Sequence, residues 1–286
     1  MPGSLSEDQV AAYRRDGYLS PLRAISAEKA LELRQRLEQN EREFGPFVVG
    51  GNGSKPHLLF PWVDQLAREP AILDAVESLF GPDLLIYTIT MWIKPAHAPG
   101  YVGWHQDASY FGLDPMEQIT VWVALSEANE KSGCVQVIPG SHKKLLHHSE
   151  KHREGKRSML PRSQSVTRDI DTSKAVSMPL SPGECSMHDT LLIHGSEGNE
   201  SDDRRIGVGI SYIPTRARFI GERRITATLV RGEDRYGYYD PERRPQADGE
   251  PEARAFHEKT IANYFASKKE LAKLYARPPE EFEAQQ

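Results

Sequence analysis

The first 80 residues of the chain carry a helical pattern of hydrophobic and polar positions. Ala30, Leu33 and Leu37 recur at the spacing of one helix face, and charged residues fill most positions between them. Ser6 is placed to cap a first helix, and Gly17 suits the end of that helix. The pattern therefore predicts three helices, over residues 5–16, 26–43 and 70–80.

From residue 84 onward the period shortens to that of β-strands. Tyr87, Ile89, Met91 and Ile93 alternate with other residues along the stretch 84–94. Turn residues, proline and glycine above all, separate this stretch from further short strands, expected over 119–125, 133–138, 176–180, 184–188, 190–194 and 205–213. Many short strands with regular turns indicate a β-sandwich or barrel of the jelly-roll kind.

The remaining segments have weaker patterns. Residues 141–174 are polar, basic and poor in aromatic side chains, which predicts a long loop or lid. A further strand is expected over 224–230, a loop over 234–252 and a helix over 253–274. Since no strong boundary divides the chain, we expect one domain over residues 1–286, with a helical N-terminal part (about 5–80), a β core (about 84–216), the lid loop (about 141–174) and a C-terminal extension (217–286).

Composition and charge narrow the class of protein. Apolar residues make up 38% of the chain and charged residues 27%, as in ordinary globular domains. The net charge of −5 argues against nucleic acid as the main partner. The chain shows neither a secretory signal nor a run of about 18 apolar residues, so we expect a cytoplasmic protein without a membrane segment. Cys134 and Cys185 lie in apolar runs and are expected to be buried free thiols.

Candidate metal ligands stand in two places along the chain. His105 and Asp107 are separated by one residue, so on an extended chain their side chains project to the same side. His194, on a later predicted strand, supplies a third ligand. Two histidines and a carboxylate usually hold non-haem Fe(II), because they leave coordination positions open. A zinc site made of the same residues is the chemical alternative, and a His-x-Asp pair without metal is also common in turns.

The other histidines lack a matching arrangement. Four of them stand in the polar segment, where solvated surface histidines are the usual case: His142, His147, His148 and His152. His188 is the nearest alternative to His194, but it lacks the spacing to a downstream arginine that His194 has. His194 is therefore the preferred third ligand.

Three blocks of sequence carry a family pattern. They are WHQDASYF over 104–111, GCVQVIPGSH over 133–142, and the run from His194 to the arginines at 204 and 205. In this order and spacing the blocks resemble the phytanoyl-CoA dioxygenase family of Fe(II)/2-oxoglutarate-dependent oxygenases. The resemblance spans roughly residues 5–216.

The resemblance implies a fold and a cosubstrate. The fold is a double-stranded β-helix, the cupin-like jelly roll, flanked by helices. The cosubstrate 2-oxoglutarate chelates the iron, and its far carboxylate pairs with an arginine about eleven residues after the distal histidine. That arginine is Arg205, with Arg204 as the alternative; neighbours on a strand face opposite ways, so one of the two should point inward. Further candidates for the cosubstrate pocket are Ser196, as a hydrogen-bond donor, Trp122, as a wall or simply a core residue, and Thr120.

The same resemblance implies an oxidation that consumes O2. While 2-oxoglutarate is decarboxylated to succinate and CO2, a small-molecule substrate is hydroxylated or otherwise oxidised. Asp107 disfavours halogenation, because halogenating relatives carry a small residue at the carboxylate position. The lysines and arginines of residues 141–174 favour an anionic substrate unless they are simply solvated. A metal enzyme of another class and a non-catalytic jelly-roll binding protein are the alternative functions.

Overall fold

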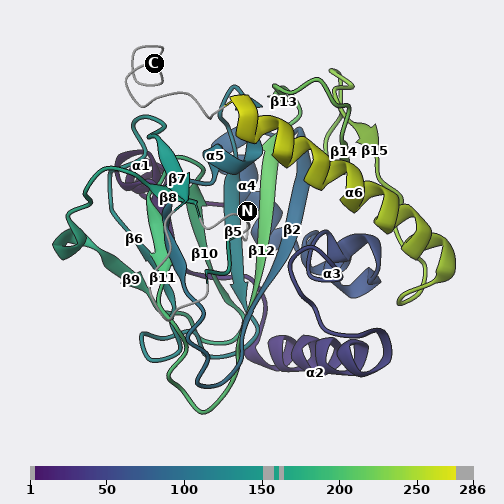
Figure 1. Ribbon diagram of the computed structural model, residues 1–286, viewed down its shortest axis with the longest axis horizontal. Helices are drawn as coiled ribbons and strands as arrows, with labels where there is room; N and C mark the ends of the chain where they lie inside the picture. The colour runs from purple at the N-terminus through teal and green to yellow at the C-terminus, as the bar shows by residue number, and fades with distance from the viewer. Residues whose placement is uncertain (1–3, 151–157, 161–163, 275–286) are drawn as a thin grey trace.

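Two sheets form the β core of the protein (Figure 1). Side chains from both sheets line a cavity. The computed structural model describes residues 4–150, 158–160 and 164–274. The larger sheet has the strand order β1 (Tyr18–Arg23), β10 (Glu184–Asp189), β5 (Ile119–Ala124), β12 (Arg205–Pro214), β2 (Leu84–Lys94), β14 (Thr226–Arg231) and β15 (Asp240–Pro241). The smaller sheet has the order β3 (Val102–His105), β11 (His194–Ser196), β6 (Val135–Val137) and β9 (Val176–Met178).

Alternation along the central strands gives the larger sheet two different faces. On β12, Ile206, Val208 and Ile210 lie in a large apolar core on the outer face. On β5, Val121 and Val123 lie in the same core. The residues between them point to the cavity and line it: Thr120, Trp122, Arg205, Gly209 and Ser211. The period of two therefore separates the residues that stabilise the sheet from those available for chemistry.

Helices cover the outer face of the larger sheet. They are α1 (Glu7–Asp16), α2 (Ala27–Phe44), α3 (Pro61–Leu66) and α4 (Pro70–Phe80), and each contributes buried residues to the large core. The Ser6 side chain caps α1, and Gly17 ends it with a φ of +85°, a conformation that glycine adopts without strain. The structure confirms the three predicted helices. The sequence pattern missed α3, because six residues are too few to show a helical period.

A long C-terminal helix, α6 (Pro251–Leu274), packs on the short helix α5 (Ala108–Phe111) (Figure 1). Tyr264 of α6 joins Tyr87 and Phe111 in a second apolar core. This helix confirms the one predicted over 253–274. Because α5 begins directly after Asp107, α6 supports the segment that carries this candidate ligand.

The structure corrects the expected strands at three places. Residues 190–192 form a turn, so the predicted strand over 190–194 is wrong, and β11 starts at His194 instead of ending there. Neither β1 nor β3 was expected. β1 contains Pro21 and lacks a clear alternation, and β3 has only four residues, so both owe their extended form to pairing with β10 and β11 respectively.

The predicted lid loop over 141–174 contains ordered structure. Strand β7 (His148–Glu150) pairs with β8 (Gln164–Val166), and a short 3-10 helix, η3, follows at Thr172–Lys174. The remaining short strands, β4 (Leu113–Asp114) and β13 (Arg218–Phe219), pair with each other. Several of the basic residues that favoured an anionic substrate lie outside the described residues: Lys151, Arg153, Lys156, Arg157 and Arg162.

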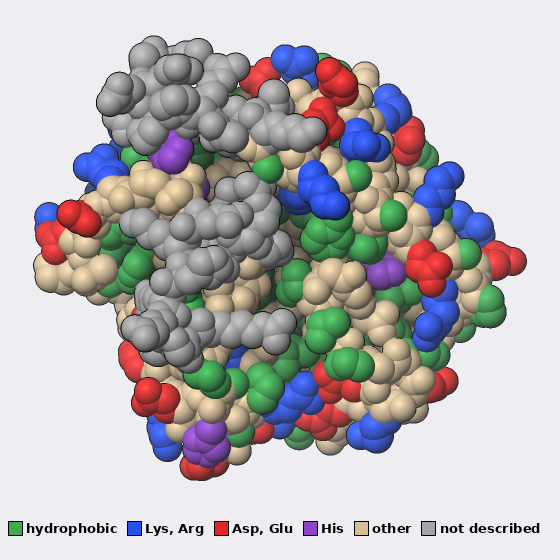
Figure 2. Space-filling view, in the orientation of Figure 1, with side chains coloured by type: hydrophobic (Ala, Val, Ile, Leu, Met, Phe, Trp, Pro, Cys, Tyr) green, Lys and Arg blue, Asp and Glu red, His purple; other side chains and the backbone are tan. Residues whose placement is uncertain are grey.

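The cysteines, the helices and the surface can be compared with what the sequence predicts. Cys134 and Cys185 are free and buried, as predicted. No helix in the described ranges is both long and apolar enough to cross a membrane. On the face shown in Figure 2, acidic and basic side chains are interspersed around the edge, and hydrophobic side chains gather nearer the middle.

Candidate metal centre

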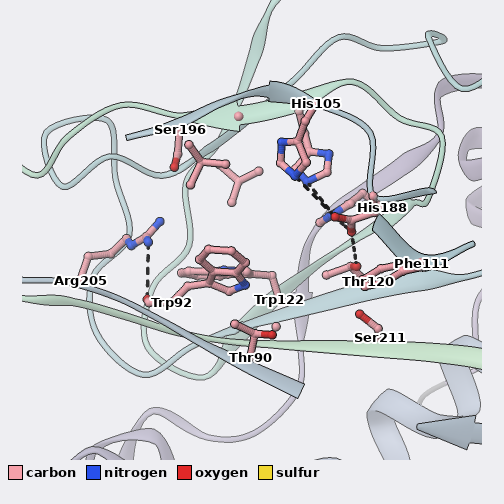
Figure 3. A pocket seen from close by; sticks show the side chains of 16 residues that line it. Thr90, Trp92, His105, Phe111, Thr120, Trp122, His188, Ser196, Arg205 and Ser211 are labelled. Atoms are coloured by element: carbon pink, nitrogen blue, oxygen red, sulfur yellow. Dashed lines mark hydrogen bonds and ion pairs between the residues drawn. The ribbon is translucent and has the colours of Figure 1, made fainter. Parts of the chain in front are cut away.

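The pairing of β3 with β11 brings the two predicted histidine ligands together. His105 stands directly opposite His194 in the register, and the two ring centroids are 4.1 Å apart. Both side chains are buried, and their Nε2 atoms lie 3.5 Å and 3.8 Å from Oδ1 of Asp107. Ligand atoms of the three residues lie within 4.8 Å of one another. The structure therefore brings the three predicted ligands together at one point of the cavity wall, where Figure 3 labels His105.

Backbone carbonyls set the tautomer of both histidines. Nδ1 of His105 lies 2.9 Å from the carbonyl oxygen of Gly103, and Nδ1 of His194 lies 2.9 Å from that of Leu192. A carbonyl only accepts, so each Nδ1 carries the proton and each Nε2 presents a lone pair toward Asp107. Burial and the neighbouring histidines lower the pKa of His194 well below its usual value, which keeps this ring neutral. Neutral imidazoles with a free Nε2 are suited to bind a metal.

Asp107 reaches the histidines by a turn of the backbone and not along a strand. Its φ of −59° and ψ of −33° are helical, and it stands at the start of α5. The extended geometry expected for His105 and Asp107 is therefore wrong, although their side chains do meet. Burial raises the pKa of Asp107, but the neighbouring side chains of His105 and His188, together with His194, outweigh this and hold the pKa well below its usual value. The carboxylate is ionised and available as a ligand.

A short hydrogen-bond chain fixes the second oxygen of Asp107. Thr120 Oγ1 donates to Asp107 Oδ2 over 2.7 Å, and Gln118 Nε2 donates to Thr120 Oγ1 over 2.8 Å. Thr120, expected near the cosubstrate, thus contacts the carboxylate ligand itself. This bond leaves Oδ1, the oxygen nearest both histidines, free for a metal.

The donor set fits a divalent transition metal. Two imidazoles and one carboxylate, with no thiolate, suit Fe(II) with open positions, and they are also within the range of zinc ligands. The open side faces the cavity, whose wall includes Trp92, Trp122 and Arg205 (Figure 3). We call this space the metal cavity.

Arg205 brings a buried positive charge to the metal cavity. Its side chain is 1% exposed, and Nη1 donates to the carbonyl oxygen of Gly133 over 3.0 Å. The guanidinium lies over the Trp122 ring, 5.1 Å from its centroid, and Nε has no hydrogen-bond partner among the described residues. Burial lowers the pKa of Arg205 to about 10, so the group stays charged at neutral pH. A buried guanidinium that has a spare donor and contacts no carboxylate of the described residues fits an anionic ligand such as a carboxylate.

Arg204 lies away from the cavity. Its guanidinium forms two hydrogen bonds of 2.7 Å and 2.9 Å with the carboxylate of Glu41 on α2. Strand β12 begins at Arg205, so Arg204 stands in the preceding loop, where it packs outward. The structure thus places Arg205, and not Arg204, on the cavity wall.

Ser196 lies on the same wall and is held by a lysine that the sequence did not single out. Lys94 Nζ donates to Ser196 Oγ over 2.8 Å and also contacts the carbonyl oxygens of Gly133 and Glu197. Burial, with the charge of Arg205, lowers the pKa of Lys94 to about 6. Because Lys94 donates to the Ser196 oxygen, the Ser196 hydroxyl hydrogen is available to a ligand in the metal cavity.

His188, which the sequence did not favour as a ligand, also lines the metal cavity (Figure 3). Its ring centroid is 4.4 Å from that of His194, and its Nε2 is 3.7 Å from Asp107 Oδ2. Neither ring nitrogen has a hydrogen-bond partner among the described residues. Alternation along β10 can predict the face of the strand on which His188 lies. Only the pairing of β10 with β5 places it opposite Thr120.

Comparison with known proteins connects this geometry to a family. The model of the phytanoyl-CoA dioxygenase (PhyH) family matches residues 2–207. Ectoine dioxygenase of Bordetella parapertussis is 24% identical over 234 residues, which cover 73% of this chain and 75% of that protein. L-proline trans-4-hydroxylase of Streptomyces griseoviridis is 25% identical over 228 residues, 72% of this chain and 85% of that one.

A solved structure supports the fold over nearly the whole chain. The non-heme monooxygenase ThoJ in its apo form is 31% identical, covers 92% of this chain and 98% of its own, and superposes with a TM-score of 0.80. The jelly-roll core and the flanking helices are thus shared with this enzyme, in agreement with the predicted fold class. The chain belongs to the phytanoyl-CoA dioxygenase family, as its sequence predicted, and with it to the Fe(II)/2-oxoglutarate-dependent dioxygenases.

Proposed function

We propose that this enzyme hydroxylates a small organic molecule at an Fe(II) ion held by His105, Asp107 and His194. The observation that carries the proposal is the combination of this buried triad with the buried guanidinium of Arg205 on the wall of the same cavity. A metal site alone fits many reactions. A metal site beside a buried arginine that can bind an anion fits a reaction that uses an anionic cosubstrate.

Arg205 and Ser196 form the binding site for the far carboxylate of 2-oxoglutarate. The guanidinium supplies charge and donors, and Lys94 orients the Ser196 hydroxyl toward the ligand. Trp122 holds the guanidinium in place through its ring and forms part of the wall that keeps water away. The 2-oxoglutarate would thus extend from the metal ligands on the smaller sheet to the first residue of β12.

Bound iron, 2-oxoglutarate and O2 supply the oxidising chemistry, with succinate and CO2 as the other products. The protein holds these reactants together. Thr120 keeps the Asp107 carboxylate in its orientation, and the Gly103 and Leu192 carbonyls keep the histidines in theirs. Because a carboxylate occupies the third protein position, we expect hydroxylation and not halogenation.

Relatives support a small-molecule substrate. Both curated relatives described above are named for compounds of low molecular mass, ectoine and L-proline. Both histidine ligands are buried in the wall of the metal cavity, which suits a compound of that size better than a macromolecule.

The test uses protein purified without oxygen and supplied with Fe(II) and 2-oxoglutarate. A weak visible absorption band from the iron chelate is expected in the wild type and is expected to disappear in Asp107→Ala. Asp202→Ala is the matched control, because the Asp202 side chain is 86% exposed and lies in a loop outside the metal cavity.

Two results would contradict the proposal. The first is the absence of the band in the wild type at every Fe(II) concentration, and the second is a band that survives in Asp107→Ala. Addition of air with candidate substrates should then consume O2 and release succinate in equal amounts. A zinc hydrolase on the same scaffold would bind metal without O2 consumption.

A further inference from the structure

A second cavity adjoins the metal cavity on the side of α6. The two cavities share Thr90, Trp92, Asp107 and Phe111, so the second one reaches the metal centre directly. We call it the helix cavity, because α6 supplies four of its lining residues, Tyr264, Phe265, Lys268 and Leu271. In the proposed function the metal cavity is filled by 2-oxoglutarate, which leaves the helix cavity as the space for substrate.

The helix cavity is lined mainly by apolar and aromatic side chains. Val49, Trp92, Phe111 and Leu160 form much of its wall together with the α6 residues. It continues into an outer groove, which shares Val49, Leu160 and Phe265 with it and is also largely apolar. The route to the metal therefore favours a substrate with an apolar body.

Lys268 is the one cationic residue that lines the helix cavity, as far as the described residues go. Its Nζ donates to the carbonyl oxygen of Tyr110 and lies 4.5 Å from the ring centroid of Phe111 and 4.4 Å from that of Tyr264. No ion pair joins it to a carboxylate of the described residues. Ring faces and one carbonyl attract an ammonium, but neither supplies a counter-charge.

The positive charge of Lys268 lacks a full counter-charge, so a bound anion would stabilise it. Burial lowers the pKa of Lys268 well below its usual value, and the charge of Asp107 opposes this. A carboxylate at Nζ would offset the cost of burial that the aromatic rings only partly compensate. A purely structural role, in which Lys268 fastens α6 to α5 through Tyr110, is the competing explanation, and it predicts no preference between charged and neutral ligands.

We propose that the helix cavity binds an organic carboxylate with an apolar body, and that Lys268 pairs with its carboxylate. The inference rests on the proposed function, since it takes Asp107 as a metal ligand. The apolar carbons then lie between Trp92, Phe111 and Phe265, and one of them faces the metal. An amine of the same shape is disfavoured, because Lys268 offers it no counter-charge.

The test compares matched probes on the enzyme loaded anaerobically with Fe(II) and saturating 2-oxoglutarate. The probes are 4-phenylbutanoate and octanoate, each against its primary amide, and binding is measured by calorimetry. Saturating cosubstrate occupies Arg205, so the probes report on the helix cavity. We expect each acid to bind the wild type at least ten-fold more tightly than its amide.

Three variants test whether Lys268 causes the preference for the acid over the amide. Lys268→Met should bring the ratio of acid to amide affinity close to one, and Lys268→Arg should retain most of it. Lys259→Met, an exposed lysine of the same helix, should leave the ratio unchanged. The visible band of the iron chelate, recorded for every variant, shows that the metal and cosubstrate sites are intact.

Each remaining outcome rejects the proposal. If neither acid binds the wild type, if acid and amide bind equally, or if the preference survives in Lys268→Met, then Lys268 does not recognise a carboxylate. The wild-type comparison decides the question even if Lys268→Met does not fold. A wild type without the visible band is a different result, because it refutes the proposed function and not the substrate preference alone.

Discussion

Thr120, on a core strand, contacts the proposed metal ligand Asp107 through its hydroxyl. Its bond to Asp107 Oδ2 is the only one that the described side chains outside the histidines make to this carboxylate. We expect Thr120→Val, which keeps the shape and removes the hydroxyl, to weaken binding of Fe(II) or Mn(II) by about 10- to 100-fold. Metal titration followed by calorimetry measures the effect. Thr120→Ser should behave like the wild type, and a Thr120→Val protein with unchanged affinity would contradict the role.

The neighbouring arginines offer a matched pair of substitutions. Arg205 is buried beside Trp122, whereas Arg204 pairs with Glu41 on α2. Loss of a charge-assisted carboxylate contact costs about 1.5–3 kcal/mol, which corresponds to a rise of roughly 10- to 150-fold in the dissociation constant of 2-oxoglutarate. We expect this rise in Arg205→Met and no change in Arg204→Met, as measured by titration of the visible band. Equal effects of both substitutions would mean that Arg205 does not bind the cosubstrate.

A buried ion pair between Lys55 and Glu242 links several elements of the fold. Lys55 Nζ donates to Glu242 over 2.6 Å, and His57 Nε2, on the 3-10 helix η1 (Pro56–Leu58), lies 3.0 Å from the same carboxylate. Thr226 and Thr228 of β14 also donate to it, each over 2.6 Å. The Glu242 side chain is fully buried. This carboxylate therefore joins η1 and β14 to the residue that follows β15.

Glu242→Gln should destabilise the fold and alter its response to acid. Burial raises the pKa of Glu242, but the charges and hydrogen bonds of Lys55 and His57 outweigh it, so the pKa in the folded state lies well below the usual value for a glutamate. A depressed pKa adds stability above about pH 4.5, and that stability is lost as the pH falls further.

The expected effect at pH 7 is a loss of about 3 kcal/mol, because the substitution leaves the Lys55 charge buried without its partner. Guanidinium unfolding at pH 7 and at pH 3.5 measures it. The difference between wild type and variant should be smaller at the lower pH. A difference that stays constant or grows on acidification would show that the ion pair is not its source.

A glycine on strand β12, Gly207, leaves space for the Trp122 ring beside Arg205. A Cβ atom added to Gly207 would lie 1.8 Å from the Trp122 ring. The indole can therefore lie flat against the strand and under the Arg205 guanidinium only because no side chain stands at this position. Alternation along β12 thus supplies both the charge and the space that its aromatic partner needs.

Across the molecule, metal and cosubstrate should connect the two sheets. His105 and His194 lie on the smaller sheet and Arg205 on the larger one, so a ligand that spans the metal cavity stabilises their arrangement. At a concentration of about 100 times the dissociation constant, binding adds about 2.7 kcal/mol to the free energy of unfolding. For a chain of this size we expect a rise in melting temperature of about 4–5 °C. Anaerobic calorimetric scans with Mn(II) and 2-oxoglutarate test this.

Asp107→Ala provides the control for the thermal shift. The variant should melt without any dependence on Mn(II) and 2-oxoglutarate, because the carboxylate ligand is missing. A wild-type melting temperature that does not respond to saturating ligands would mean that they do not bind the folded protein at the expected site.

Much of the architecture and the metal triad could be predicted from local patterns. The helices α1, α2 and α4 are predicted by apolar spacing and caps, β2 by alternation, and β5 and β12 as short strands between turn residues. These signals are short-range, since each depends on residues a few positions apart. His105 and Asp107 stand out by their ligand types and their spacing, and His194 by its ligand type and its distance from the arginines at 204 and 205.

What the patterns could not supply is the set of contacts between segments that are distant in sequence. The pairing of β3 with β11 brings His105 to His194, and the pairing of β10 with β5 brings in His188. Lys94 and Lys268 are ordinary lysines in the sequence. They lie beside Ser196 and in the wall of the helix cavity only because of the way in which β2 and α6 pack. The ligands and the chemistry thus follow from residue identity, whereas the neighbours that orient them and select a substrate follow from packing, which no local pattern encodes.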